Sequence, residues 1–237
     1  MANFVLVHGS SHGAWCWRDV VPLLQAAGHT ARAIDLPCHG DDQTPVKAAS
    51  MDRYVDTILN ALDGPTILVG HSLAGMFISQ AGERDPSNIS RLVYVCAWLP
   101  SDGQTTRTMR DGATSNPLAD VIRFTDDRLC SYFDADKVEA HFYHDCPAGT
   151  LEFARENLCP EPLEPQLTPV RLGANFAGLN KSYVVGKHDR AIAPLTQMRF
   201  AQSLPPQDRY EMDCAHSPFF AQPAKLMEIL MKIVEDQ

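Results

Sequence analysis

The stretch between Ile67 and Met76 constrains the fold of this chain more than any other. An apolar run typical of a β-strand stops at Gly70, and an amphipathic run begins directly after Ser72. The apolar residues of the second run recur at the spacing of one helical face, and they are Leu73, Met76, Phe77 and Ala81. A serine on a sharp strand-to-helix turn is typical of a nucleophile elbow, in which small neighbours, here Gly70 and Ala74, let strand and helix approach closely. The alternative is an ordinary glycine turn, because Ala74 stands where the stricter G-x-S-x-G pattern has glycine.

Strands and helices alternate on both sides of this turn. The expected strands cover residues 4–7, 30–36, 65–69, 91–96, 182–185 and 210–212. The expected helices cover residues 17–27, 51–62, 73–84, 194–204 and 223–234, with Ser50 able to cap the second and Pro223 able to open the last. This alternation predicts an α/β fold whose mostly parallel central sheet is joined by right-handed crossovers and covered by helices on both faces.

The alternation stops between residues 101 and 180. This stretch is irregular and proline-rich, and it carries many apolar and aromatic side chains. An insertion between two core strands predicts a cap over the edge of the sheet. We therefore expect a core formed by residues 1–100 and 181–237, and an inserted cap subdomain formed by residues 101–180. Most of the aromatic residues would form the small core of the cap, and a minority would line a substrate pocket, since such pockets are mostly apolar.

Composition limits the partners and the compartment. The 237 residues suit one large domain with an insertion. A net charge of −9, without a basic run that is interleaved with aromatic residues, disfavours binding to nucleic acid. The seven cysteines lack metal-binding spacing, so we expect free thiols in a reducing compartment and neither a metal nor a cofactor. Because the sequence has no secretory signal and no long apolar run, we expect a cytoplasmic protein that does not bind membranes. The expected partner is a small molecule, and the sequence does not decide whether the protein forms a homodimer.

A loop rich in glycine and serine, residues 8–13, follows the first expected strand. Such a loop exposes backbone N–H groups at the carboxyl edge of the sheet, where open α/β sheets bind their ligands. In hydrolases with a nucleophile elbow, this loop donates one N–H group to the oxyanion, and the residue after the serine donates the other. We assign these two donors to Ser10 and Leu73. The alternative is an ordinary turn between a strand and a helix.

A serine hydroxyl needs an adjacent base, and the base needs a third group that fixes its tautomer. In this architecture the chain order is serine, then a carboxylate, then histidine. Ser72, Asp189 and His216 follow that order, and each comes just after an expected strand. Asp102 and Asp213 are competing candidates for the carboxylate. Asp213 is too close to His216 in the chain to point back at it easily.

Several motifs together resemble those of the α/β-hydrolase superfamily. They are residues 4–9 (F-V-L-V-H-G), 12–15 (H-G-A-W) and 70–73 (G-H-S-L), with Asp189, Ala215 and His216. More narrowly, the chain is similar to the branch that holds plant methylesterases of the salicylate-binding type, hydroxynitrile lyases and their bacterial esterase relatives. The similarity covers nearly the whole chain and is weakest through the cap. It implies the α/β-hydrolase fold.

Two positions distinguish the chemistries within this branch. Its lyases carry Thr where this chain has Gly9, and Lys directly after the catalytic His where this chain has Ser217. The resemblance therefore implies a serine carboxylesterase that hydrolyses short-chain, methyl or aryl esters through an acyl-enzyme. We expect substrate contacts from Gly9, His12, Trp98 and Ser217. The alternatives are a hydroxynitrile lyase on the same scaffold and a non-enzymatic receptor for a small ligand.

Overall fold

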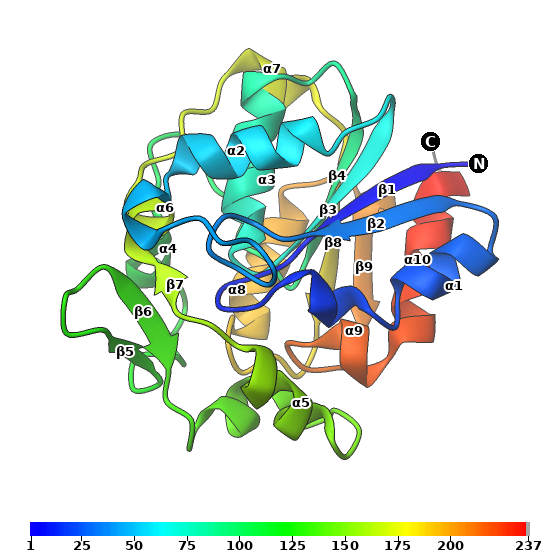
Figure 1. The fold of residues 1–237 in the computed structure, drawn as a ribbon. Helices are drawn as coiled ribbons and strands as arrows, with labels where there is room; N and C mark the ends of the chain where they lie inside the picture. Colours follow the sequence, from blue (N-terminus) through cyan, green and yellow to red (C-terminus); the bar gives the residue numbers. More distant parts are fainter. Residues whose placement is uncertain (236–237) are drawn as a thin grey trace.

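The centre of the protein is a six-stranded sheet, which Figure 1 shows in a computed structural model that describes residues 1–235. The strands lie in the order β2-β1-β3-β4-β8-β9, and all neighbouring pairs are parallel. Their bounds are β1 Asn3–Val7, β2 Thr30–Ile34, β3 Thr66–His71, β4 Ile89–Val95, β8 Lys181–Gly186 and β9 Arg209–Met212. Every expected strand is present, with ends that differ from the prediction by up to two residues. The predicted parallel sheet is confirmed.

Helices cover both faces of this sheet (Figure 1), which explains why its central strands are mostly apolar. Side chains of a strand alternate between the faces. In β1, Phe4 and Leu6 pack into one hydrophobic cluster, and Val5 and Val7 pack into a second cluster on the other face. The helices of the core are α1 Val21–Ala26, α2 Met51–Asn60, α3 Ala74–Arg84, α8 Pro194–Gln202, α9 Pro218–Ala221 and α10 Pro223–Glu235.

A capping serine sets the start of α2, and a proline sets the start of α1. The hydroxyl of Ser50 accepts a hydrogen bond from the amide of Arg53 at 3.2 Å, so the predicted cap of α2 is confirmed. The predicted helix over residues 17–27 is wrong in its first part. There the chain forms a 3₁₀ turn over Ala14–Trp17, and α1 begins only at Val21. Pro22 has no amide hydrogen, so it is tolerated in the first turn of a helix but not in the interior.

Residues 101–180 contain more regular structure than the sequence indicates. They form a small antiparallel sheet in the order β5-β6-β7, together with short helices and a π-helical turn. The bounds are α4 Thr106–Asp111, β5 Ile122–Phe124, β6 Cys130–Phe133, the π turn Glu139–Tyr143, α5 Thr150–Asn157, β7 Glu161–Pro162, α6 Leu163–Leu167 and α7 Ala174–Gly178. Most of these elements lie together beside the core (Figure 1). α7 instead packs on α3, where the carboxylate of Glu83 accepts the amides of Gly173 and Phe176, each at 2.8 Å.

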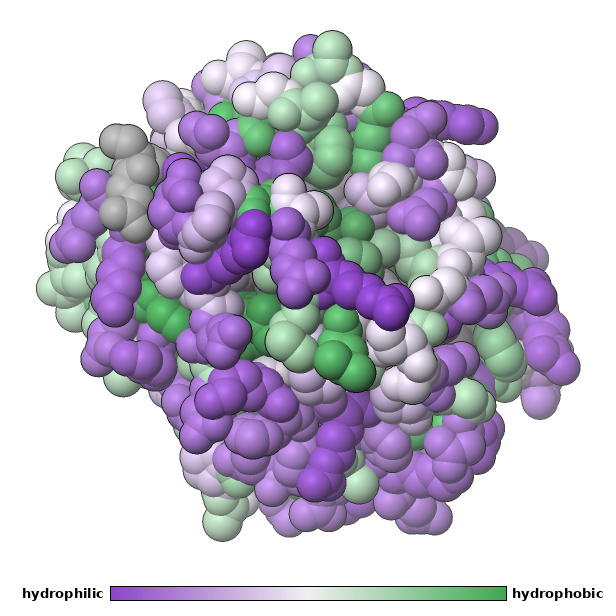
Figure 2. Space-filling model, turned by 180° about the vertical axis from the view of Figure 1, so that it is seen from behind, coloured by the Kyte–Doolittle hydropathy of each residue, from purple (hydrophilic) through white to green (hydrophobic). Residues whose placement is uncertain are grey.

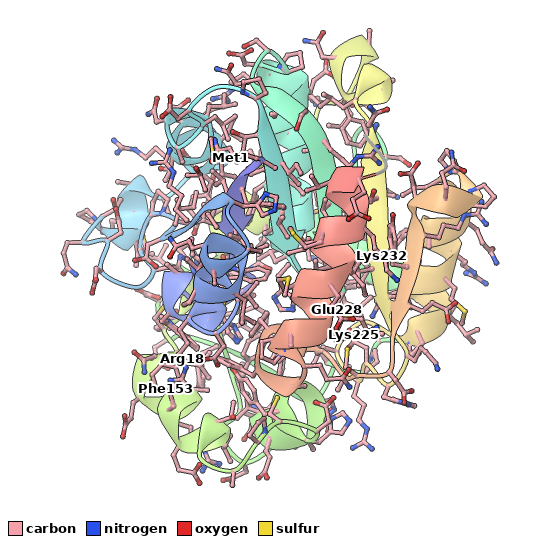
Figure 3. All side chains as sticks on the ribbon, turned by 90° about the vertical axis from the view of Figure 1, so that its right-hand side faces the viewer. Met1, Arg18, Phe153, Lys225, Glu228 and Lys232 are labelled. Carbon is pink, nitrogen blue, oxygen red and sulfur yellow. The ribbon has the colours of Figure 1, made fainter. Side chains whose placement is uncertain are left out.

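The cap insertion also contacts the first residues of the core. The guanidinium of Arg18 lies 3.7 Å from the ring centroid of Phe153 in α5, and Figure 3 shows the two side chains side by side. This is the geometry of a cation–π interaction, and it ties the insertion to the segment before α1. The exact division into core and cap stays a prediction.

The face of the molecule opposite to the view of Figure 1 is largely polar. Figure 2 shows that hydrophilic side chains dominate the face seen from behind, with hydrophobic ones scattered among them. Scattered apolar residues are normal on a protein surface and do not indicate a docking face. Within residues 1–235, no helix combines the length and the apolar character needed to cross a bilayer. The cytoplasmic location and the partners expected from the sequence stay predictions.

Candidate active site

Ser72 occupies a strained turn between β3 and α3. β3 ends at His71 and α3 begins at Ala74, so the chain reverses within two residues. Ser72 has φ +54°, a left-handed conformation that costs a non-glycine residue about 1–3 kcal/mol. The surrounding backbone holds it there, since its amide donates to the carbonyl of Val95 at 3.2 Å and its carbonyl accepts the amide of Trp98 at 3.1 Å. This is the geometry of a nucleophile elbow.

Three side chains form one hydrogen-bonded chain at this turn. Nε2 of His216 lies 3.0 Å from Oγ of Ser72, and Nδ1 of His216 lies 2.7 Å from Oδ2 of Asp189. His216 is 1% exposed and Asp189 is 4% exposed. Because Nδ1 faces a carboxylate, it carries the proton, and Nε2 is left to accept the hydroxyl proton of Ser72. The structure therefore brings together the three residues that the chain order predicted.

The carboxylate of Asp189 is held by four hydrogen bonds. Oδ1 accepts the amides of Ala191 at 2.6 Å and of Ile192 at 2.9 Å. Oδ2 accepts Nε2 of the buried Gln197 at 2.6 Å, in addition to the bond with His216. These bonds fix the orientation of the carboxylate. The sequence analysis missed Gln197, because nothing in its local pattern separates it from any other glutamine of a surface helix.

The two competing aspartates lie elsewhere. Asp102 accepts a hydrogen bond from a backbone amide of the insertion at 2.8 Å. Asp213 accepts Nε2 of His188 at 2.8 Å and lies 3.3 Å from Nζ of Lys187. Neither carboxylate is bonded to His216 in the described part of the chain. The geometry therefore favours Asp189 over both of them as the carboxylate that bonds His216.

The amides assigned to the oxyanion are both unbonded. Around the loop after β1, the carbonyl of Gly9 lies 2.9 Å from Nδ1 of His8, and the carbonyl of Ser10 lies 2.8 Å from Nδ1 of His12. Within residues 1–235, by contrast, no hydrogen bond is made by the amide of Ser10 or of Leu73. Leu73 precedes α3, and the first amides of a helix have no partner inside it. Two free donors are what an oxyanion requires.

The sequence matches the alpha/beta hydrolase family over residues 4–229. The chain belongs to this family. It is 32% identical to putative methylesterase 11, chloroplastic, of Arabidopsis thaliana, over 98% of this chain and 63% of that protein. The chain thus spans less than two thirds of the length of that relative. It is also 29% identical to methylesterase 1 of the same plant, over 98% of this chain and 96% of that protein.

A similar fold occurs in solved structures. The pyrethroid hydrolase PytH superposes on this α/β hydrolase with a TM-score of 0.88 and 24% identity, over 99% of this chain and 98% of that one. At this level of identity, the likeness concerns the fold alone. Together with the family match, it confirms the α/β-hydrolase fold expected from the sequence.

In this α/β hydrolase, His12 braces the loop after β1. Nδ1 lies 2.8 Å from the carbonyl of Ser10, and Nε2 lies 2.7 Å from the hydroxyl of Tyr143. The Tyr143 hydroxyl donates to Nε2, so Nδ1 carries the proton and donates to the carbonyl. Burial lowers the pKa of His12 to about 4, so the ring is neutral at physiological pH. Its predicted contact with substrate stays a prediction.

The other three expected substrate contacts are placed as follows. A Cβ added at Gly9 would lie 2.8 Å from both Cβ of Ser72 and Nδ1 of His71. The amide of Trp98 bonds the carbonyl of Ser72, while its ring packs edge-on against Phe200, 6.0 Å away. Ser217 is fully buried directly before α9. All three lie beside the triad in space or in sequence, and their roles in substrate binding stay predictions.

A buried ion pair that the sequence analysis missed anchors the same loop. Oε2 of Glu161, in β7, accepts the amide of Ser11 at 2.9 Å and lies 3.0 Å from Nε2 of His39. Nδ1 of His39 faces the carbonyl of Pro37 at 3.0 Å, so both ring nitrogens face acceptors. Burial opposes the charge on His39, but Glu161, the Pro37 carbonyl and Asp35 together outweigh burial and raise the pKa of the ring. A glutamate of the insertion therefore holds the residue next to Ser10.

Replacing Glu161 by glutamine is expected to destabilise the protein by about 3 kcal/mol, because it leaves a buried histidine without its counter-charge. Urea unfolding followed by circular dichroism measures this change. Glu164→Gln is the matched control, since Glu164 also accepts a backbone amide, that of Met51 at 3.0 Å, but is exposed. Equal unfolding midpoints for the wild-type protein and Glu161→Gln would contradict the expectation.

The free energy of unfolding is expected to decrease as the pH is lowered below 6.5. Burial lowers the pKa values of His8, His12 and His71, so between pH 6.5 and about 4 these side chains bind fewer protons when folded than when unfolded. The free energy of unfolding therefore decreases as pH falls through this window, with His12 alone contributing on the order of 3 kcal/mol. Urea unfolding at about pH 7 and about pH 5 tests this, and His12→Gln should flatten the dependence. A stability that does not change with pH in this window would refute it.

No group of three or more His, Cys, Asp or Glu side chains is arranged to hold a metal ion in the part of the chain that the structure describes. All seven cysteines are free thiols. The groups that the structure brings together at the site are the hydroxyl of Ser72, the imidazole of His216 and the carboxylate of Asp189.

Proposed function

We propose that this α/β hydrolase is a serine carboxylesterase that acts on small methyl, short-chain or aryl esters. The enzyme class, a carboxylic ester hydrolase, rests on the family and on relatives that are named methylesterases. The observation that carries the proposal is the chain of bonds from Asp189 through His216 to Ser72, at 2.7 and 3.0 Å, beside two free amides. Each of these groups has a defined task in ester hydrolysis.

The reaction follows from this geometry. Oγ of Ser72 attacks the ester carbonyl while Nε2 of His216 takes its proton. The amides of Ser10 and Leu73 stabilise the resulting oxyanion, each contributing about 3 kcal/mol. His216 then passes the proton to the departing alkoxide, and an acyl-enzyme on Ser72 remains. Water repeats the cycle, with its proton taken by His216, and releases the acid and the free serine.

Cyanohydrin cleavage is less well supported. The position of Gly9 is too crowded for a larger residue, since a Cβ there would press on Ser72 and His71. Ser217, directly after His216, offers no positive charge for a departing cyanide. A binding protein without activity would also gain nothing from the strained conformation of Ser72.

A substrate panel tests the proposal. Purified protein is assayed with methyl, short-chain and aryl esters, and with a cyanohydrin whose cleavage is followed by cyanide release. We expect ester hydrolysis and no cyanide. Cyanide release without ester hydrolysis would support the lyase, and binding of esters without turnover would support a receptor.

A further inference from the structure

The general base stands on a segment without regular secondary structure. His216 lies between β9, which ends at Met212, and α9, which begins at Pro218. We call residues 213–217 the base loop. Since no helix or strand fixes its backbone, the position of the imidazole depends on the hydrogen bonds that the loop makes with its surroundings. The groups that hold this loop therefore decide where Nε2 of His216 points.

The core holds the base loop from one side. Nε2 of the buried His71, at the end of β3, lies 2.8 Å from the carbonyl of His216. A carbonyl oxygen only accepts hydrogen bonds, so Nε2 carries the proton of this bond. The amide of His188, just after β8, donates to the carbonyl of Cys214 at 3.0 Å. Both bonds attach the loop to strands of the central sheet.

The insertion holds the base loop from the other side, through Asp145. This residue lies in the connection between the π turn and α5, and its Oδ2 accepts the amide of Ala215 at 2.6 Å. Such a short bond to a carboxylate is charge-assisted and stronger than a bond between neutral groups. Asp145 is exposed, but Ala215 is fully buried, and within residues 1–235 its amide has no other acceptor. Without Asp145, a buried N–H group next to the catalytic histidine would lose its partner.

The same segment of the insertion contacts the imidazole itself. The ring of Phe142, three residues before Asp145, lies edge-on to the ring of His216, with the two centroids 5.2 Å apart. The next residue, Tyr143, bonds His12, which braces the loop of the first oxyanion amide. Residues 142–145 thus contact both the general base and the loop after β1.

We propose that Asp145 is a positioning residue for His216. Its carboxylate fixes the amide of Ala215 and so keeps Nε2 of His216 within hydrogen-bonding distance of Ser72. A displacement of about 1 Å at a catalytic group can cost about 100-fold in rate. The hydrogen bond performs this role, and the negative charge is not required for it. This inference rests on the proposed esterase function.

Two substitutions of Asp145 test the inference. Asp145→Ala removes the acceptor, and water that replaces the carboxylate would not tie the loop to the insertion. Because His216 serves both halves of the reaction, kcat for an aryl ester should fall by about tenfold to a hundredfold, with little change in KM. Asp145→Asn keeps an oxygen that accepts the amide, so its kcat should stay within about threefold of wild type. An equal loss in both variants would overturn the inference, because the charge would then be what matters.

Asp127→Ala is the matched control. Asp127 is also an exposed aspartate of the insertion, and its Oδ1 accepts the amide of Leu129 at 3.0 Å, in the turn between β5 and β6. Its replacement should leave kcat within about twofold of wild type. Circular dichroism at the assay temperature gives the folded fraction of each variant. If Asp145→Ala lost activity only in proportion to its loss of folded protein, or lost none, the inference would be overturned and the esterase would stay intact.

Labelling of Ser72 measures the same effect without ester turnover. When a fluorophosphonate reacts with an activated serine, Oγ forms a bond to phosphorus, fluoride leaves, and His216 takes the hydroxyl proton. The labelling rate should fall in Asp145→Ala by about as much as kcat/KM, and Asp145→Asn should restore most of it. Equal labelling rates in the wild-type protein and Asp145→Ala would overturn the inference whether or not esters are hydrolysed. A wild-type protein that neither hydrolyses esters nor is labelled would overturn both proposals.

Discussion

Replacing Ser72 by alanine is expected to reduce kcat for ester hydrolysis by at least about 10⁴-fold. No other hydroxyl is bonded to Nε2 of His216 in the described residues, so the variant has no nucleophile for the acyl-enzyme. Substrate binding should change little, because the hydroxyl contributes to the transition state rather than to ground-state contacts. Initial rates with an aryl ester, measured over a range of concentrations, separate kcat from KM.

The control for this variant is Ser203→Ala. Ser203 is exposed at the end of α8, where its hydroxyl bonds only the local backbone, so its removal should leave the rate within about twofold of the wild-type rate. Circular dichroism should be the same for both variants. Wild-type rates in Ser72→Ala would show that another residue performs the reaction, and the proposed triad would then be wrong.

The core of the fold could be predicted because its signals are local. Buried parallel strands are largely apolar runs, as in Phe4–Val7, and most core helices show their own apolar periodicity, with a serine cap at α2. The carboxyl ends of parallel strands gather at one edge of the sheet, so Ser72, Asp189 and His216 could be grouped although they are far apart in the chain. A prediction of this kind depends on topology and not on any single contact.

The surroundings of the triad could not be predicted, because they depend on contacts between distant segments. Gln197 and Glu161 look like ordinary polar residues in the sequence, and only the folded chain brings them against Asp189 and Ser11. The same holds for Asp145, which meets the loop of the general base only in the folded chain. The small sheet of the insertion was missed because its strands are very short and β7 contains a proline, Pro162.

The closest contact at the elbow involves a residue that the sequence interpretation did not name. Gly70 and Ala74 were expected to let strand and helix approach. A Cβ at Gly70 would lie 2.8 Å from Cδ1 of Ile78 and 3.2 Å from the backbone carbonyl carbon of Ala74, so Gly70 does let the strand and the helix approach. A Cβ at Gly75 would instead overlap the backbone carbonyl oxygen of Trp98. Gly75, one position after the elbow pattern ends, is therefore the residue at which an added side chain would clash most severely.

Replacing Gly75 by alanine is expected to lower the free energy of unfolding by about 3 kcal/mol or more. The added Cβ would overlap the carbonyl oxygen of Trp98, and the amide of the same residue donates to the carbonyl of Ser72, so a shift of the Trp98 backbone would disturb that bond. We therefore expect kcat to fall as well, in the fraction of the protein that remains folded. Urea unfolding measures the stability. Rates of ester hydrolysis, measured without denaturant at a temperature well below Tm, give the activity.

Gly178→Ala is the matched control, because a Cβ at that helical glycine of α7 would meet no atom within 4 Å. There the substitution should stabilise the protein slightly, since alanine loses less backbone entropy than glycine when a helix forms. The two substitutions add the same methyl group to the same type of residue. If both variants gave the same unfolding midpoint, the expected clash between a Cβ at position 75 and the carbonyl oxygen of Trp98 would be wrong.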